Sequence, residues 1–301
     1  MKQIYFILVL LVYQNLQSQI TINNTAYTPT QLVDGVLVPT GSGVTVSNVT
    51  FSGVRNVSSR YQIGYFSTAT TTLAQMGFTD GVVLSTGNTS EIPLSLGTNP
   101  GSVGQMSRNY SSCTAGEVRK GGTCPSVIND LNILSGGFNY FNSAILEFDF
   151  VPNNSEVSFR YIFGSEEYLE WVNSSYNDVF GFFVDGVNVA LTPGSGDPIT
   201  INTINTSQNS GLFVDNTTGI YNTQMDGFTK SLQITLKGLS AGLHTMEFAI
   251  ADAGDAVLDS WIFIEAKSFA DTPVGVPEPS SLTLLGLILA ALGWSRRKAA
   301  K

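Results

Sequence analysis

Apolar and polar side chains alternate with a period of two in several stretches of the chain. Residues 144–150 carry apolar side chains at every second position, with Glu147 and Asp149 between them. Residues 157–163 and 231–237 show the same alternation. Because successive side chains of a β-strand point to opposite faces, each stretch predicts a strand with one buried face and one solvent-facing face. Such strands are typical of antiparallel sheets.

Two further stretches lack this alternation and predict central strands that are buried on both faces. Residues 179–184 are apolar except for Gly181, and they are followed by Asp185-Gly186. An Asp-Gly pair after an apolar run is typical of a tight hairpin turn. Residues 261–266 form a second run of this kind.

Helical periodicity is weak along the chain, with short candidates only at residues 72–77 and 127–134. Turns rich in Gly, Asn and Pro separate the strands throughout residues 20–270, and residues 193–222 are expected to form a long surface excursion. The sequence therefore predicts an all-β fold, a single antiparallel β-sandwich or jelly-roll-like domain with short helices.

The N-terminus has the layout of a secretory signal peptide. Lys2 precedes an unbroken apolar run, residues 4–12, and polar residues follow. We expect the general secretory machinery to recognise residues 1–18 and cleavage to fall between Ser18 and Gln19. The alternative interpretation is a buried strand of the mature domain.

The C-terminus combines a short motif, an apolar run and a basic cluster. Pro277, Glu278 and Pro279 precede uncharged residues 280–294, and the basic side chains follow at Arg296, Arg297 and Lys298. A bilayer-spanning helix needs about 20 residues, so this run is short for a permanent anchor. The basic cluster belongs on the cytoplasmic side, which leaves the preceding domain outside.

This tail resembles the PEP-CTERM sorting signal of Gram-negative bacteria that make exopolysaccharide. The resemblance implies transient insertion into the inner membrane and processing near the Pro-Glu-Pro motif by exosortase, an integral-membrane cysteine protease. Residues 276–301 would then be removed or exchanged, leaving residues 19–275 as the exported domain. A plain C-terminal transmembrane helix is the alternative.

Composition and charge exclude some classes of partner. The chain is 43% hydrophobic and 12% charged, and its 23 acidic and 14 basic residues give a net charge of −9. Five of the basic residues but only one acidic residue lie in the two ends, so the domain between them is more acidic still. Nucleic-acid binding requires a basic surface, so we expect no nucleic-acid partner.

Cys113 and Cys124 are the two cysteines of the chain. An exported protein passes through an oxidising compartment, so this pair predicts a disulfide bond. Closing a loop of this size contributes roughly 3 kcal/mol in the chain-entropy model. A zinc site would need carboxylate ligands in addition to these thiols and His244, which disfavours that interpretation.

Acidic and amide side chains gather where strands are predicted to begin or end. Calcium requires six to eight oxygen ligands, which converging loops of a β framework can supply. The alternative is that these side chains cap turns through Asx hydrogen bonds or pair with Arg160 or Arg119. The candidate calcium ligands are Glu166, Glu167, Asn177, Asp178, Asp252, Asp255 and Asp259.

Catalytic arrangements find little support in the sequence. A glycosidase needs two carboxylates that face each other across a sugar, whereas neighbours such as Glu166 and Glu167 point to opposite faces of a strand. His244 shares its strand face with Met246 and Phe248, which is typical of a packed residue and not of a general base. We therefore expect no catalytic site and a non-enzymatic protein.

Seven blocks of the domain together resemble the choice-of-anchor L domain. Bacterial surface proteins that share this domain end in different sorting signals, which agrees with the tail described above. The resemblance implies a surface location but no particular activity. The blocks are residues 81–87, 144–152, 163–168, 177–183, 226–229, 249–255 and 259–269.

Two functions remain open on the sequence. The first is an exported surface or extracellular-matrix protein that supports adhesion or exopolysaccharide and biofilm structure, with extracellular polysaccharide or other surface proteins as partners. The second is a calcium-dependent carbohydrate-binding module. In that case exposed aromatic side chains would stack on sugar faces, with Tyr168, Trp171 and Tyr176 as candidates.

Overall fold

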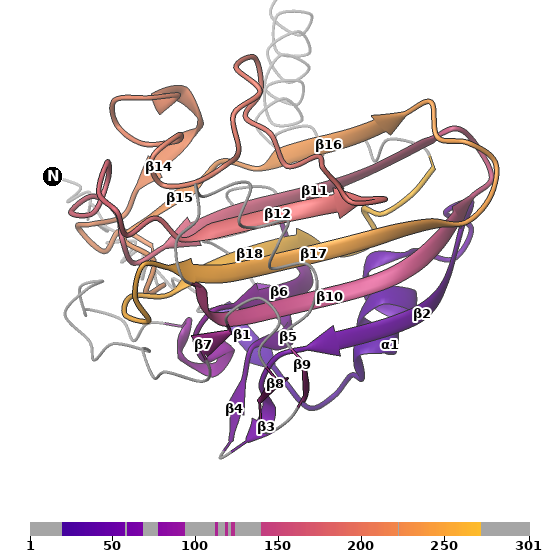
Figure 1. Cartoon of the computed structure of the whole chain (residues 1–301), viewed down its shortest axis with the longest axis horizontal. Helices are drawn as coiled ribbons and strands as arrows, with labels where there is room; N and C mark the ends of the chain where they lie inside the picture. The colour runs from indigo at the N-terminus through magenta and orange to yellow at the C-terminus, as the bar shows by residue number, and fades with distance from the viewer. Residues whose placement is uncertain are drawn as a thin grey trace, which may run out of the picture.

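A computed structural model describes residues 20–57, 59–68, 78–93, 112–113, 118–119, 122–123, 140–221 and 223–271. Within these ranges the backbone forms antiparallel sheets with only short helical segments, which confirms the predicted all-β class. The strands of both sheets run lengthwise across the view in Figure 1.

The larger sheet, here called sheet A, has eight strands in the described part of the chain. Their order is β1-β5-β6-β18-β11-β15-β14, and β16 pairs with β11 beside β15. The strands are β1 (Ile20–Asn23), β5 (Ile63–Thr68), β6 (Asp80–Ser85), β11 (Glu156–Ser165), β14 (Phe213–Asp215), β15 (Gly227–Thr229), β16 (Leu232–Lys237) and β18 (Ser260–Glu265).

The second sheet, sheet B, has six strands in the same ranges, in the order β13-β12-β17-β10-β2, with β7 paired to β10. They are β2 (Val44–Ser52), β7 (Ser112–Cys113), β10 (Tyr140–Pro152), β12 (Val179–Val184), β13 (Val187–Asn188) and β17 (His244–Ala253). Two small ribbons complete the described strands, β3 (Arg55–Val57) with β4 (Arg60–Tyr61) and β8 (Val118–Arg119) with β9 (Gly122–Thr123).

The main core lies between the two sheets and includes the side chains that the alternation assigned to the buried faces. Along β10 the even-numbered apolar residues from Ala144 to Phe150 are fully buried, and β16 alternates strictly between buried and exposed positions. Phe159 of β11 joins the layers, because its ring centroid lies 5.3 Å from that of Phe182 and 5.5 Å from that of Phe248. The period-two prediction is therefore confirmed for β10 and β16.

For residues 157–163 the prediction was wrong about the second face, because Ser158 and Arg160 of β11 are only 1% and 3% exposed. That face is covered, and Ile162 packs there in a second apolar cluster with Phe78 and Phe263.

Both predicted central strands are also confirmed. Every residue of β12 and of β18 is buried. Asp185 and Gly186, which join β12 to β13, have φ angles of 51° and 80°. Positive φ at both central positions is the requirement of a type I′ hairpin turn, which Asp-Gly meets at low cost.

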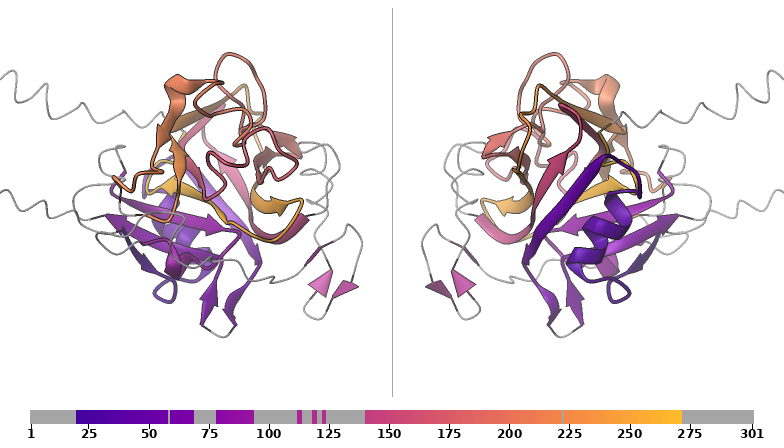
Figure 2. Two further views of the ribbon diagram at one scale, coloured as in Figure 1. Left: turned by 90° about the vertical axis from the view of Figure 1, so that its left-hand side faces the viewer. Right: turned by 90° about the vertical axis from the view of Figure 1, so that its right-hand side faces the viewer.

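One helical segment was not expected from the periodicity. A helical turn, α1 (Pro29–Gln31), continues into a π-helical turn, η1 (Leu32–Leu37), beside β2 (Figure 2). Thr28 and Gln31 form a capping box at its start, and Pro29 occupies the first helical position. These are local start signals that the sequence does contain, but the segment is too short to show a helical period. The remaining described helical turns are η2 (Thr89–Glu91) and η3 (Ser210–Leu212).

The expected surface excursion after residue 193 is irregular, but it is not confined to the surface. Ile199, Ile201 and Ile204 are fully buried and belong to the main core. This part of the expectation was wrong, because three apolar side chains within an Asn- and Thr-rich stretch are enough to fasten an irregular segment against the sheets.

Several predictions concern residues outside the described ranges. These are the signal peptide and its cleavage site at Ser18 and Gln19, the tail at residues 276–301, the candidate helices at 72–77 and 127–134, and the disulfide, since Cys124 and the side chain of Cys113 are not described. Among the residues that are described, no helix has the length and apolar character needed to cross a bilayer.

The sandwich has two ends with different features. At one end, here called the tail end, the last described residue is fastened to the domain: Asp271 N donates to Ser42 O at 2.9 Å, and Ala270 pairs with Ser158 near the start of β11. From Ser158, β11 continues to Ser165 at the other end, here called the acidic end, which is about 23 Å away at 3.3 Å per residue.

Candidate functional site

Five carboxylates gather at the acidic end, drawn from both sheets. Because the strands are antiparallel, β6, β11 and β17 end here while β12 and β18 begin here. Each carboxylate lies next to or within one of these strand ends, and none is more than 3% exposed. The group, here called the acidic cluster, consists of Glu166, Glu167, Asp178, Asp252 and Asp259.

Hydrogen bonds between strand ends orient three of these side chains. Asp259 N donates to Glu166 Oε2 at 3.0 Å, and Asp178 N donates to Glu167 Oε2 at 3.1 Å. Asp178 accepts at both oxygens, from Ala253 N at 3.2 Å and from Ser260 Oγ at 2.7 Å. Since Ala253 lies in sheet B and Ser260 in sheet A, the cluster connects the two layers.

The remaining two carboxylates are each satisfied at one oxygen only. Asn142 Nδ2 donates to Asp252 Oδ2 at 2.7 Å, and Thr86 Oγ1 donates to Asp259 Oδ1 at 3.3 Å. Asp252 Oδ1 and Asp259 Oδ2 are buried and have no hydrogen-bond partner. Gly87 borders the second of these atoms so closely that a Cβ there would come within 2.1 Å of it.

Burial raises the pKa of every member of the cluster. It raises the pKa of Glu167 to about 8 and that of Asp259 to about 7. The pKa values of Glu166, Asp178 and Asp252 lie well above their ordinary range, because burial and then neighbouring carboxylates disfavour the charged form. The cluster is therefore expensive to ionise without a compensating positive charge.

The pairing with Arg160 that the alternative interpretation suggested is not found. Both Nε and Nη2 of Arg160 donate to the carboxylate of Glu265. The side chain of Arg160 is 4% exposed and that of Glu265 is 12% exposed. The Arg160 guanidinium also lies 5.6 Å from the centre of the Phe78 ring. Among the described ion pairs none involves a member of the acidic cluster. The other suggested partner, Arg119, has no described side chain.

The two other candidate ligands stand apart from the cluster. Asp255 Oδ1 accepts from Val257 N at 3.0 Å, which is the turn-capping role that the alternative interpretation assigned. Asn177 is partly exposed, although its Oδ1 is buried without a hydrogen-bond partner. In the described part of the chain, no group of three or more His, Cys, Asp or Glu side chains has the arrangement of a metal site.

Sequence reasoning missed the neutral residues that line the cluster. Thr86, Gly87 and Ser260 lie within the sequence blocks 81–87 and 259–269 that resemble the choice-of-anchor L domain. The sequence could therefore have pointed to them. Asn142 carried no signal, because its position follows from an irregularity in the pairing of β10 with β17 between Phe141 and Ala144. A β-bulge of this kind redirects a side chain, here toward Asp252.

The aromatic candidates divide into one buried and two accessible side chains. Tyr168 is fully buried, and its hydroxyl donates to Ile204 O at 2.7 Å, so the expectation that it is exposed was wrong. Trp171 is 38% exposed and packs edge-to-face on Tyr176, with ring centroids 5.0 Å apart. Both belong to the segment 166–178 that links β11 to β12 and carries three acids of the cluster.

His244 lies at the start of β17, toward the tail end, as a packed and hydrogen-bonded residue. Its ring contacts Phe150 and its Nδ1 is 2.7 Å from Asp185 Oδ2. The hydrogen bond to Asp185 raises the pKa of His244, and the same bond lowers the pKa of Asp185 against the opposing effect of burial. The pair ties the Asp185-Gly186 turn to β17.

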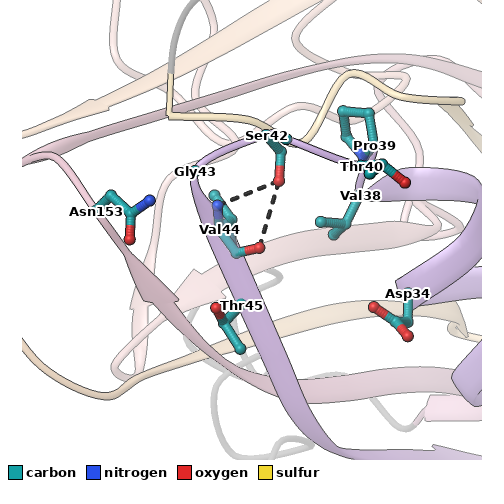
Figure 3. Close-up of a pocket in the computed structure, with 10 residues that line it drawn as sticks. Asp34, Val38, Pro39, Thr40, Ser42, Gly43, Val44, Thr45 and Asn153 are labelled. Atoms are coloured by element: carbon teal, nitrogen blue, oxygen red, sulfur yellow. Dashed lines mark hydrogen bonds between the residues drawn. The ribbon is translucent and has the colours of Figure 1, made fainter.

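A polar pocket of about 280 Å³ lies at the tail end, far from the acidic cluster (Figure 3). It is lined by residues 38–45 with Asp34 and Asn153, and Ser42 Oγ closes a tight turn there by bonding to Val44 N at 3.1 Å. Ser42 also accepts from Asp271, so the pocket marks the place where the domain meets the tail.

Comparison with known proteins identifies two segments. Residues 21–270 match the model of the Choice-of-anchor L domain, and residues 275–298 match the PEP-CTERM protein-sorting motif. No curated protein and no solved structure matches the chain. The sorting motif indicates export and cell-surface sorting in a bacterium with processing by exosortase, and neither segment is of an enzymatic kind. Because the first match covers most of its length, the chain belongs to the Choice-of-anchor L family.

Proposed function

We propose that this protein is displayed on the surface or in the extracellular matrix of a Gram-negative bacterium, where it supports adhesion or exopolysaccharide and biofilm structure without catalysing a reaction. In this proposal the general secretory machinery exports the chain. The tail then enters the inner membrane transiently, and exosortase removes residues 276–301. The partners are extracellular polysaccharide or other surface proteins.

One observation carries the proposal: the family domain ends at residue 270 and the sorting motif begins at residue 275. The whole sandwich therefore precedes the signal. Asp271 leaves the domain at the tail end, so the acidic end lies about 23 Å farther along β11 from the Ser158–Ala270 pair. The loops at the acidic end would then face away from the cell surface, where they can contact a partner.

The burial of the acidic cluster supports a non-enzymatic role. Hydrolysis of a sugar requires two carboxylates on either side of an accessible glycosidic bond. Glu166 and Glu167 are 3% and 1% exposed and are held by backbone donors. A polysaccharide chain cannot pass between carboxylates that are closed off in this way.

Deleting the gene in its own host is expected to reduce surface attachment and retained extracellular polysaccharide. Complementation with the full chain should restore both properties. A chain that stops after Asp271 should be exported but should restore neither, because it lacks the sorting motif. Attachment is measured as adherent cell mass under flow. Unchanged attachment in the deletion strain would argue against the proposal.

The exposed Trp171, packed on the partly exposed Tyr176, favours a second candidate function, a calcium-dependent carbohydrate-binding module. Exposed aromatic faces are suited to stacking against sugars, and this pair shares its loop with the acidic cluster. A bound cation in the cluster would hold that loop in place.

The second candidate is tested with the full chain in mild detergent on a glycan array, with calcium and with chelator. Trp171→Ala is expected to weaken calcium-dependent glycan binding about tenfold or more, as loss of a central aromatic contact does elsewhere. Trp171→Tyr keeps an aromatic face and should retain most of the binding. If the protein bound no glycan on the array, either with calcium or with chelator, the carbohydrate-binding function would be rejected and the surface-display function would remain.

A further inference from the structure

We propose that the acidic cluster binds calcium between the two sheets, with Asp252 and Asp259 as its first ligands and Glu166, Glu167 and Asp178 completing the set. This inference deepens the second candidate function by assigning the metal to particular residues. It does not depend on carbohydrate binding, and the surface-display proposal stands whatever its outcome.

The first argument is the lack of a counter-charge beside five buried carboxylates. All five carboxylates are nearly or fully buried, and the described ion pairs leave them without a cationic side chain. Burying charges without a counter-charge is costly, and proteins answer that cost by pairing the charges or by coordinating a metal. A divalent cation would offset the repulsion among these groups at the exported chain's working pH.

The second argument is the pair of unsatisfied oxygens. Buried polar atoms nearly always have a partner, yet Asp252 Oδ1 and Asp259 Oδ2 have none. The lack of a side chain at Gly87 lets the Asp259 carboxylate lie against the backbone there, where a Cβ would come within 2.1 Å of Oδ2. These atoms are free to accept a cation.

The third argument is the shell of donors that holds the other oxygens. Asn142 fixes Asp252, Thr86 fixes Asp259, and backbone N–H groups fix Glu166 and Glu167. Metal-binding carboxylates are commonly oriented by such outer hydrogen bonds. The cluster at present gathers no three acids into metal-site geometry, so binding requires rotation of side chains toward Asp252 and Asp259.

The chemistry of the available groups selects the ion. The cluster contains carboxylate, hydroxyl and amide oxygens, and the single histidine of the chain lies toward the other end. Calcium accepts six to eight oxygens in irregular geometry, and extracellular calcium sites work at about 0.1 to 1 mM. Magnesium demands a tighter octahedron, which loops from several different strand ends are poorly suited to form.

The test uses the full chain in mild detergent, stripped of metal with chelator. Equilibrium dialysis with radioactive calcium is expected to give saturable binding at or below about 1 mM. Saturating calcium should raise the melting temperature by about 5 °C or more. Asp252→Asn and Asp259→Asn should each weaken binding about tenfold or more. In chelator both variants should melt no lower than the wild type, because Asn can still accept the hydrogen bond but carries no charge.

Asp255→Asn is the matched control, because Asp255 is three residues from Asp252 but caps its own turn. It should bind calcium as the wild type does. Absence of saturable calcium binding by the wild type would overturn the inference, as would equal loss in the Asp255 variant. The inference would also be overturned if Asp252→Asn and Asp259→Asn lowered the melting temperature by the same amount with calcium and with chelator. That result would show that the two carboxylates have a purely structural role. Calcium binding without glycan binding would reject only the second candidate function.

Discussion

Deleting Arg296, Arg297 and Lys298 is expected to leave the chain as an uncut precursor in the cell. The apolar run before them is short for a membrane span, so in the proposed topology its orientation would depend on the basic cluster keeping the C-terminus in the cytoplasm. Without that cluster the Pro277-Glu278-Pro279 motif would not be presented to exosortase at the outer face. An immunoblot against the domain, after separation of membranes from culture medium, measures precursor and processed form.

Lys301→Gln is the control for this deletion, because it removes one positive charge but keeps the basic cluster and should mature normally. Glu278→Gln, with the charge cluster intact, should also accumulate precursor, because it alters the motif itself. Normal maturation of the deletion variant would contradict the proposed role of the basic residues. Loss of the protein from all fractions would be distinguished by pulse labelling, which reveals whether the precursor is made and then degraded.

Replacing Arg160 by Met is expected to destabilise the domain by about 3–5 kcal/mol, because it leaves the buried Glu265 without its counter-charge. Burial already raises the pKa of Glu265 against the lowering effect of Arg160, so removing the arginine will raise it further. Chemical unfolding of the full chain, followed by tryptophan fluorescence, measures the loss. Trp261 reports on the right region because it lies in β18 with Glu265.

The double variant Arg160→Met with Glu265→Leu separates lost charge pairing from lost packing. Replacing both partners of a buried ion pair by apolar groups is often close to neutral, so the double variant should be more stable than Arg160→Met alone. The packing of Arg160 on Phe78 is retained in part by the methionine side chain. Additive destabilisation by the two changes would contradict this account.

The candidate site was only partly accessible from the sequence. Acidic residues near predicted strand ends formed a sensible pool, and five of its seven members do meet at one end of the sandwich. Asp252 and Asp255 have only two residues between them, and the sequence did not reveal that their roles differ. Asp252 is buried in the cluster, whereas Asp255 caps its own turn. Their difference arises because Asp252 still belongs to β17 while Asp255 follows its end.

The sequence by itself determined the strands at residues 144–150 and 231–237 and which of their faces is buried, because alternation with a period of two is a local property of an extended backbone. It also contained both terminal segments and the tight turn at Asp185-Gly186. Only the tertiary structure decided which side chains meet. Thr86 bonds Asp259 across 173 positions, and Arg160 pairs with Glu265 across 105. Such contacts depend on the order and register of strands in two packed sheets, and the free energy that selects this order comes from burial across the whole core.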